Sequence, residues 1–403
     1  MKSYLADWIL PVASPPIANG ALVVDDAGRI VFLGERGQMP VGTDETHFES
    51  SVIMPGLVNA HTHLEFSDLE APLGEPGMEF TQWIGEVIKF RFGSERVAKS
   101  EAIQMGLEQS ARHGVAAIGE IATAPVVLED YKSALPCPAA LCVFFEQLGS
   151  DDAVVEQKVA ELSQFFSQTK EVSPVQQFVA AVSPHAPYSV GDKLLDGLVA
   201  TSIQKRAVVA MHVAETLAER EFVETKTGPF LEMLQSMGVW RPDAYGNYDS
   251  IEGILAKLSE CESSLIVHGN YLNGRELDFI AANRERMSIV FCPRTHAYFD
   301  HARYPLEEML ERGINVAVGT DSRASNPDLD LGQELVEIRR RHPEVAPEAI
   351  LKMGTTGGAN SLGLDESFGS LSQGQMAHFC CRQTADTSSP FAWLEAAPDQ
   401  KIQ

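Results

Sequence analysis

Short apolar runs alternate with longer amphipathic stretches along most of the chain. Eight runs have the length of a strand, and segments with the apolar spacing of helices separate most of them. Eight strands that alternate with helices predict a (β/α)8 barrel of the α/β class, with a doubly wound sheet as the competing layout. The runs are Ser51–Ala60, Val115–Ile121, Ala139–Phe145, Gln177–Ser183, Ala207–His212, Ser264–His268, Met287–Phe291 and Ile314–Val318.

The two ends of the chain show a different pattern. An Asp-Asp-Ala-Gly turn separates the apolar runs 21–25 and 29–33, which indicates a hairpin. A further apolar run, Met376–Cys381, lies near the C-terminus. We therefore predict a small β-sandwich domain formed by residues 1–55 and 368–403, beside a barrel that spans residues 56–367.

Composition and charge narrow the class of partner. The 403 residues carry 31 basic and 56 acidic side chains, a net charge of −25. A surface this acidic argues against nucleic acid and against an anionic membrane as partners, because both need clustered Lys and Arg. No apolar stretch has the length of a membrane span, and the first residues do not resemble a secretory signal peptide. The six cysteines form no CxxC pair, so we expect reduced thiols and a cytoplasmic protein.

Histidines and one aspartate fall at the C-terminal ends of the predicted strands. His61 and His63 end the first run, His212 ends the fifth, His268 ends the sixth, and Asp321 follows the eighth. In a barrel these strand ends converge on the face that carries the active site. Imidazoles together with a carboxylate suit a divalent ion such as zinc, with room for a water. A lone HxH pair often occurs by chance, but this ordered series does not, so we predict a metal site.

Four segments carry a resemblance to a known family: PGLVNAHTHLE, HVAET, VHGN and VGTDSRASN. Together they resemble the amidohydrolase superfamily, and within it the deaminase and chlorohydrolase branch. That branch holds adenosine-type, methylthioadenosine/S-adenosylhomocysteine, guanine, cytosine and aminodeoxyfutalosine deaminases. The resemblance covers nearly the whole chain and is specific for the superfamily and the branch, whereas it says little about the substrate.

The resemblance implies a role for each residue that matches a family motif. Glu215 matches the catalytic acid/base, and His268 matches the histidine that orients the attacking water or the substrate carbonyl. Asp321 is a ligand that can also accept the proton of the water. The fourth predicted strand ends at residues 182–185 without the carboxylated lysine of two-metal members, so we expect one divalent ion, with zinc preferred over iron. The implied metal ligands are His61, His63, His212 and Asp321.

The chemistry of such a site follows from its residue types and does not depend on the family resemblance. A zinc-bound water has a pKa near 7 instead of about 15.7, so hydroxide is available at neutral pH. Glu215 can pass a proton to a ring nitrogen, hydroxide attacks the amino-bearing carbon, and ammonia leaves. We therefore expect an aminohydrolase that acts on an amino-purine or a nucleoside-like heterocycle. Opening of a cyclic amide and loss of chloride from a triazine remain alternatives, and a non-enzymatic metal-binding protein is a more distant one.

Five further positions are candidates for contact with the substrate. His185, in SPHAPYSV, can hydrogen-bond a ring nitrogen or a ribose hydroxyl. Nucleoside deaminases of the branch carry a glutamate before a tryptophan where this chain has Gln82 and Trp83, so Gln82 would have to bind the hydroxyl. Glu146 stands near the position of an arginine that binds the homocysteine carboxylate, which argues against S-adenosylhomocysteine. Arg294 can meet an acidic group such as a benzoate, which suggests 6-amino-6-deoxyfutalosine.

The sequence leaves several points open. It is compatible with a homodimer but does not decide the oligomeric state. It assigns no clear role to Glu120 or Arg323, and His378 is expected to be structural. The partner that we expect is a small-molecule amino-heterocycle.

Overall fold

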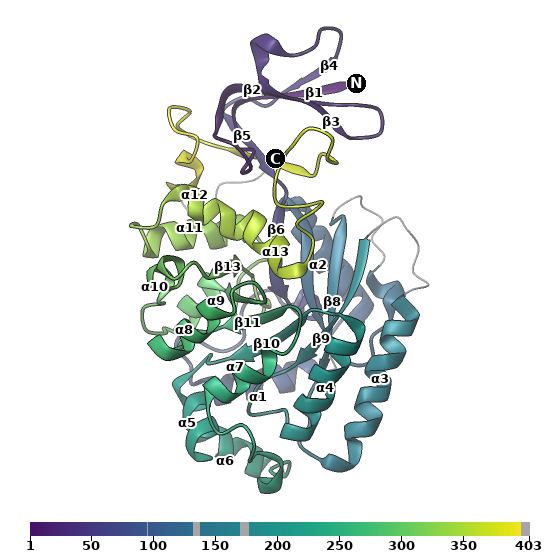
Figure 1. Ribbon diagram of the computed structural model, residues 1–403, viewed down its shortest axis with the longest axis vertical. Coiled ribbons are helices and arrows are strands. Elements are labelled where there is room, and N and C mark those ends of the chain that lie inside the picture. Colours follow the sequence, from purple (N-terminus) through teal and green to yellow (C-terminus); the bar gives the residue numbers. More distant parts are fainter. Residues whose placement is uncertain (95, 132–137, 170–176, 396–403) are drawn as a thin grey trace.

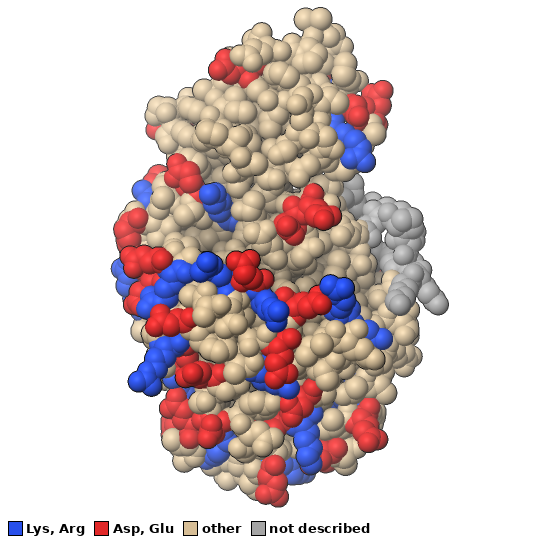
Figure 2. Space-filling view, in the orientation of Figure 1, with Lys and Arg blue, Asp and Glu red and all other residues tan. Residues whose placement is uncertain are grey.

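The computed structural model describes residues 1–94, 96–131, 138–169 and 177–395. It contains two sheets, which lie in separate parts of the molecule, and described segments near both ends of the chain belong to the smaller sheet (Figure 1). Acidic and basic side chains are interspersed over the barrel on the face shown in Figure 2, so neither sign dominates there. Within the described ranges, no helix combines the length and the apolar character that crossing a bilayer requires.

Eight parallel strands pair in sequence order and form the larger sheet. A bridge between Thr62 and Asp321 joins the first strand to the segment after the last, so the sheet closes on itself. This arrangement confirms the predicted α/β barrel and rules out an open doubly wound sheet. The strands are β6 (Leu57–Thr62), β7 (Val115–Ala122), β8 (Ala140–Gln147), β9 (Gln177–Pro184), β10 (Val209–Val213), β11 (Ser264–His268), β12 (Met287–Phe291) and β13 (Asn315–Val318).

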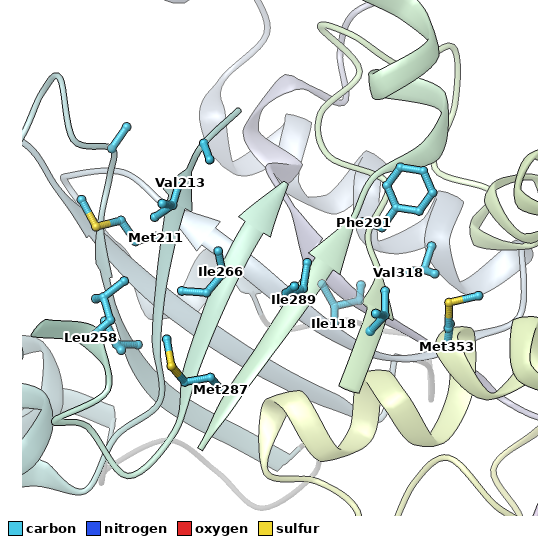
Figure 3. Packing of buried hydrophobic residues seen from close by; sticks show 14 of the residues in the cluster. Ile118, Met211, Val213, Leu258, Ile266, Met287, Ile289, Phe291, Val318 and Met353 are labelled. Atoms are coloured by element: carbon cyan, nitrogen blue, oxygen red, sulfur yellow. The ribbon is translucent and has the colours of Figure 1, made fainter. Parts of the chain in front are cut away.

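Helices cover the outside of the barrel and bury their apolar faces against it (Figure 1). Figure 3 shows Ile266 of β11 and Met287 of β12 in the same apolar cluster as Leu258 of a covering helix. Ile266 therefore points toward the helices, and its neighbours on the strand point the other way. The helices are α1 (Phe80–Arg91), α2 (Lys99–Arg112), α3 (Val155–Gln168), α4 (Asp192–Lys205), α5 (Leu217–Thr225), α6 (Pro229–Ser236), α7 (Ile251–Leu258), α8 (Gly274–Ala282), α9 (Pro293–Tyr298), α10 (Leu306–Glu311), α11 (Leu331–Arg341), α12 (Pro347–Lys352) and α13 (Gly358–Leu362).

The smaller sheet contains strands from both ends of the chain. Its order is β14-β5-β1-β2-β3, and β4 also pairs with β1. The predicted hairpin corresponds to β2 and β3, but the sheet is a single mixed one instead of the two stacked sheets of a sandwich. The strands are β1 (Lys2–Ile9), β2 (Ile17–Val24), β3 (Ile30–Glu35), β4 (Asp44–His47), β5 (Ser51–Pro55) and β14 (Phe379–Gln383).

The apolar run 51–60, which we predicted as one barrel strand, is divided between the two sheets. It forms β5 of the smaller sheet and then β6 of the barrel, with Gly56 between them. A Cβ atom at Gly56 would lie only 2.5 Å from the Cβ of Ala116. The absence of a side chain at Gly56 therefore lets the chain pass close to β7 as it enters the barrel.

A buried ion pair joins the C-terminal strand to the barrel. Arg382 of β14 donates to Asp330 over 2.8 Å, and both side chains are 6% exposed. Asp330 also caps α11 by accepting the N–H of Gly332 over 2.9 Å. Burial alone raises the pKa of Asp330, but Arg382 and His113 outweigh it, so the pKa lies below its usual value. The Asp330 carboxylate therefore stays charged, and its burial is tolerated because Arg382 pairs with it.

Replacing Arg382 by Met should destabilise the protein, because it leaves the Asp330 carboxylate buried without its partner. We expect the free energy of unfolding to fall by about 3–5 kcal/mol, as measured by urea denaturation. The matched control is Arg206→Met, which removes an exposed pair with Glu262 and should cost less than about 1 kcal/mol. Equal losses in the two variants would show that the buried pair has no special role.

Candidate active site

A cavity of about 650 Å³ opens where the C-terminal ends of the barrel strands converge. Residues with metal-binding or acid–base side chains line part of it, and apolar side chains from α1 and α6 line much of the remainder. His61 lies next to this cavity and is fully buried. The polar residues that line the cavity include His63, Glu146, His185, His212, Glu215, His268 and Asp321.

The structure brings the predicted metal ligands together, since the ligand atoms of His61, His63 and Asp321 lie within 4.8 Å of one another and His212 lies beside them. The Nε2 atoms of His61 and His63 lie 3.7 and 3.6 Å from Oδ1 of Asp321. These separations are too long for hydrogen bonds, but they are close to the roughly 3.4 Å expected between two ligand atoms of one tetrahedral zinc ion. The His61 ring centroid also lies 5.0 Å from that of His212. Side chains from three different strand ends thus surround one position.

The donor set fits a divalent metal ion. Nε2 of His61, which faces Asp321, is buried and has no hydrogen-bond partner among the described residues, which is costly unless another group binds it. Nδ1 of His212 is within 2.8 Å of the carbonyl of His185, so His212 keeps Nε2 free, as metal-ligating histidines usually do. Imidazole nitrogens and the Asp321 carboxylate are ligands that zinc and iron accept.

The first and last barrel strands approach each other closely at the site. A Cβ atom at Gly319 would lie 2.7 Å from the carbonyl oxygen of His61. The side chain of Asn59 donates to Oγ1 of Thr320 over 2.8 Å, and Thr62 donates to the Asp321 carbonyl over 2.8 Å. These contacts hold the HxH segment in register with the aspartate.

Three non-glycine residues at the site have left-handed backbone conformations. Ala214, His268 and Asp321 have φ values of 55°, 67° and 54°. Strand alternation would point His268 toward the covering helices, as it does Ile266, and the left-handed φ turns the side chain into the cavity instead. Such conformations cost of the order of 1–3 kcal/mol each and are held by their surroundings. Tyr304, for example, donates to the carbonyl of His268 over 2.8 Å.

Glu215 stands beside the ligand cluster. Its Oε1 lies 3.4 Å from Nε2 of His268. Burial raises the pKa of Glu215 well above its usual value, and the charges of Asp321 and Glu219 add to the effect. A carboxyl group with a raised pKa suits the donation of a proton near neutral pH.

Two buried residues that hold Glu215 were missed in the sequence. Glu219 accepts the backbone N–H groups of Ala214 and Glu215 over 2.7 and 2.9 Å. Asn270 donates to the Glu215 carbonyl over 3.0 Å. Glu219 follows Glu215 by four residues, the spacing of one helical turn, and this spacing was the only indication of its role in the sequence. Two exposed glutamates on a helix surface have the same spacing. Burial raises the pKa of Glu219 to about 7, against the opposing effect of the N–H groups that it accepts.

Three of the five predicted substrate contacts line the cavity. They are Trp83, Glu146 and His185. The indole of Trp83 donates to the Ala324 carbonyl over 3.2 Å and packs against Phe299, so it forms part of the wall. Burial lowers the pKa of His185 to about 4, so this imidazole is neutral at pH 7.

The structure does not place the other two predicted contacts at the cavity. Gln82 is exposed and lies outside the residues that line the cavity. Arg294 also lies outside them, because its guanidinium is paired with both carboxylate oxygens of Asp328 over 2.7 and 3.1 Å. Arg323 also lies outside the residues that line the cavity, and it donates to the Glu70 carbonyl.

Glu120 and His378, for which the sequence indicated no functional role, make contacts that support the fold. Glu120 is buried and accepts the N–H of Leu64 over 2.9 Å, directly after the HxH segment. His378 stacks on Phe368, with ring centroids 4.6 Å apart. These contacts give Glu120 a role in holding the HxH loop and His378 a role in packing.

Comparison with known proteins assigns the chain to a family. The chain belongs to the amidohydrolase family, whose model matches residues 52–394. An adenosine deaminase from Helicobacter pylori is 28% identical over 325 residues, which cover 79% of this chain and 76% of that protein.

Two solved structures share the fold. The structure of Helicobacter pylori aminofutalosine deaminase in complex with methylthio-coformycin has a TM-score of 0.82 and 23% identity, and the match covers 98% of this chain and 95% of that one. An adenosine deaminase from Xanthomonas campestris with bound zinc has a TM-score of 0.74 and 20% identity, covering 98% and 89% of the two chains.

Replacing His61 by Ala should abolish metal binding, because it removes a ligand that is buried at the centre of the cluster. We expect the purified wild-type protein to hold about one ion per chain, as a mononuclear site requires, and the variant to hold almost none by elemental analysis. Zinc should raise the melting temperature of the wild type and leave that of the variant unchanged. The control is His47→Ala, at an exposed position of β4, and it should behave as the wild type. Full metal content in His61→Ala would disprove the site.

Proposed function

We propose that this protein is a metal-dependent aminohydrolase that deaminates an amino-purine or a nucleoside-like heterocycle. The observation that carries the proposal is the position of Glu215. Its carboxyl group lies 3.4 Å from His268 and stands apart from the cluster of His61, His63 and Asp321. A binding protein needs only the ligands, whereas hydrolysis of an amidine also needs a separate acid–base group. The family and the named activities of the relatives support the same class of reaction.

We propose zinc as the metal, with iron as the alternative. The ligand set of three imidazoles and one carboxylate supports this choice, and so does the zinc in the related Xanthomonas campestris structure. When bound, the ion supplies a water whose pKa is lowered to about 7. His61, His63, His212 and Asp321 would hold it.

The side chains around the ion divide the proton transfers between them. Burial raises the pKa of Asp321, but the neighbouring His61, His268 and His63 outweigh this effect and keep the pKa below its usual value. Asp321 is therefore ionised and is placed to accept the proton of the attacking water. Glu215, with its raised pKa, protonates a ring nitrogen and makes the adjacent carbon electrophilic. A C–O bond then forms. The C–N bond breaks as the amino group takes the proton held by Asp321 and leaves as ammonia, and the proton of the new C–OH group returns to Glu215 as the ring carbonyl forms.

His268 is placed to stabilise the oxygen that becomes bonded to the reacting carbon. Its backbone conformation and its bond from Tyr304 hold it in the cavity, so the ring need not reorganise during the reaction. The apolar walls from α1 and α6 limit water around the heterocycle, which strengthens these polar contacts.

The substrate within this class is set by the cavity. Aminodeoxyfutalosine stays a candidate because of the likeness to the aminofutalosine deaminase, and adenosine because of the relative with that activity. Arg294 supplies no argument for an acidic substituent, since its partner is Asp328.

Glu215→Gln should separate catalysis from metal binding. The amide can still hydrogen-bond a ring nitrogen but cannot deliver a proton, so kcat for ammonia release should fall by about 10²–10⁴-fold. Metal content and KM should stay near the wild-type values. Glu252→Gln, at an exposed position of α7, is the control and should keep full activity. Wild-type kcat in Glu215→Gln would refute the proton transfer, and loss of the metal would assign Glu215 to the ligand set.

A further inference from the structure

Glu219 is a buried carboxyl group that takes no part in the proposed proton transfers. It lies in the first turn of α5, is 0% exposed, and stands outside the residues that line the cavity. Its Oε1 accepts the N–H of Ala214 over 2.7 Å and its Oε2 accepts the N–H of Glu215 over 2.9 Å. Burying an ionisable group costs free energy, so a carboxyl group away from substrate and metal calls for another explanation.

Capping of α5 does not explain the position of Glu219. The cap residue is Thr216, whose side chain accepts the N–H of Glu219 over 3.0 Å. In a capping box, a glutamate at this helix position bonds to the N–H of the cap residue itself. Glu219 instead extends past Thr216 to the two residues before it. Its two hydrogen bonds therefore hold the turn that leads from β10 into α5.

This turn fixes the direction in which the Glu215 side chain leaves the backbone. Ala214 has a left-handed φ of 55°, a conformation that its surroundings must hold. The Ala214 carbonyl accepts the N–H of Tyr271 over 2.9 Å, and the Glu215 carbonyl accepts the side chain of Asn270 over 3.0 Å. Glu219 supplies the acceptors for both N–H groups. Both of its oxygens thus contribute to where the catalytic acid stands.

Holding the turn in this way requires an ionised carboxylate. A protonated carboxyl group, like an amide, keeps one good acceptor oxygen and presents a donor at the other position. One of the two N–H groups then faces a donor and loses its partner. Burial raises the pKa of Glu219 to about 7, against the opposing effects of the N–H groups of Glu215 and Ala214 and of the Arg220 charge. Glu219 therefore takes up a proton as the pH falls through neutrality.

The surrounding charged groups leave Arg220 as the cation that acts on Glu219. Arg220 is itself paired with Glu276 of α8 over 2.9 Å and with Glu224 over 3.0 Å. The phenol of Tyr188, after β9, is neutral at pH 7 because burial raises its pKa. The helices α6 and α7 pack against α5, and their charged side chains are the exposed Glu232 and Glu252 and Lys257, which pairs with Asp196 over 3.1 Å.

We propose that Glu219 is a positioning residue, whose ionised carboxylate holds Glu215 where it can protonate the heterocycle, and that protonation of Glu219 lowers the activity. This inference rests on the proposed deaminase function. It assigns part of the loss of activity in acid to a residue that touches neither the substrate nor the metal ligands. Glu219 acts through the backbone of Glu215, so its removal should affect the chemical step and leave substrate binding nearly unchanged.

The test compares the wild type with Glu219→Gln, which resembles the protonated acid at every pH. Ammonia release from adenosine is measured between about pH 5.5 and pH 9, and the ratio of wild-type to variant kcat is taken at each pH so that shared titrations cancel. Above about pH 8 the ratio should be about 10–10², because the acid is misplaced, with KM and metal content near the wild-type values. Below about pH 6 the ratio should approach 1, because the wild-type carboxylate is then protonated as well. A purely structural defect would give a ratio that does not change with pH.

Two further variants complete the comparison. Glu224→Gln makes the same change at an exposed position of the same helix, and its kcat should equal that of the wild type at every pH. Glu219→Asp keeps two acceptor oxygens on a shorter side chain, so its kcat should lie between those of the wild type and Glu219→Gln. A wild-type kcat in Glu219→Gln, or a ratio that is the same at all pH values, would overturn the inference.

Amide hydrogen exchange separates this inference from the reaction. Mass spectrometry of the zinc-loaded protein at about pH 8, where the carboxylate is ionised, follows exchange in the peptide that contains residues 212–218. Exchange there should be about 3–10-fold faster in Glu219→Gln, since one amide loses its acceptor, and unchanged in Glu224→Gln. If the wild type releases no ammonia from amino-purines, the deaminase proposal fails, whereas faster exchange in Glu219→Gln still supports the role of Glu219 in holding the turn. Equal exchange in the wild type and Glu219→Gln would overturn that role whatever the value of kcat.

Discussion

The site depends on the closure of the barrel between β6 and β13. His61 and His63 lie near the start of the barrel and Asp321 near its end, so they can share an ion only if these strands meet in one register. Gly319 allows the approach, since any Cβ there would collide with the His61 carbonyl. The bridge between Thr62 and Asp321 then sets the level at which the ligands face each other. An ion held by these residues would add a link across the closure, so metal binding and closure should stabilise each other.

The site combines buried polar atoms without partners and unfavourable backbone conformations, both of which a protein interior normally avoids. Ring nitrogens of His61 and an oxygen of Glu146 are buried and have no hydrogen-bond partner within the described ranges, and three residues have left-handed backbone conformations. Each feature costs stability, and each leaves an atom or a side chain directed toward a ligand. Glu219 and Tyr304, which make ordinary hydrogen bonds, supply the rigid surroundings.

The sequence predicted the barrel and the residues that gather at its mouth, because strand ends of a parallel barrel meet on one face whatever the details of packing. It could not predict the division of residues 51–60, since two buried strands joined by Gly56 have the same apolar pattern as one. Arg294 was predicted to face the substrate, because a sequence does not reveal that Asp328 pairs with it. Glu219 was missed because burial, which decides its role, is a property of the fold and not of the spacing.

The smaller sheet joins segments from opposite ends of the chain, and this has a consequence for biosynthesis. Strand β5 pairs with β1 through only two residues, Trp8 and Ile9, and its other edge is covered by β14, which is synthesised after all the other described strands. Until then the nascent chain exposes an apolar strand edge of the kind that recruits other chains into aggregates. Every molecule passes through that stage, so the interval before β14 emerges is when a chaperone would matter most.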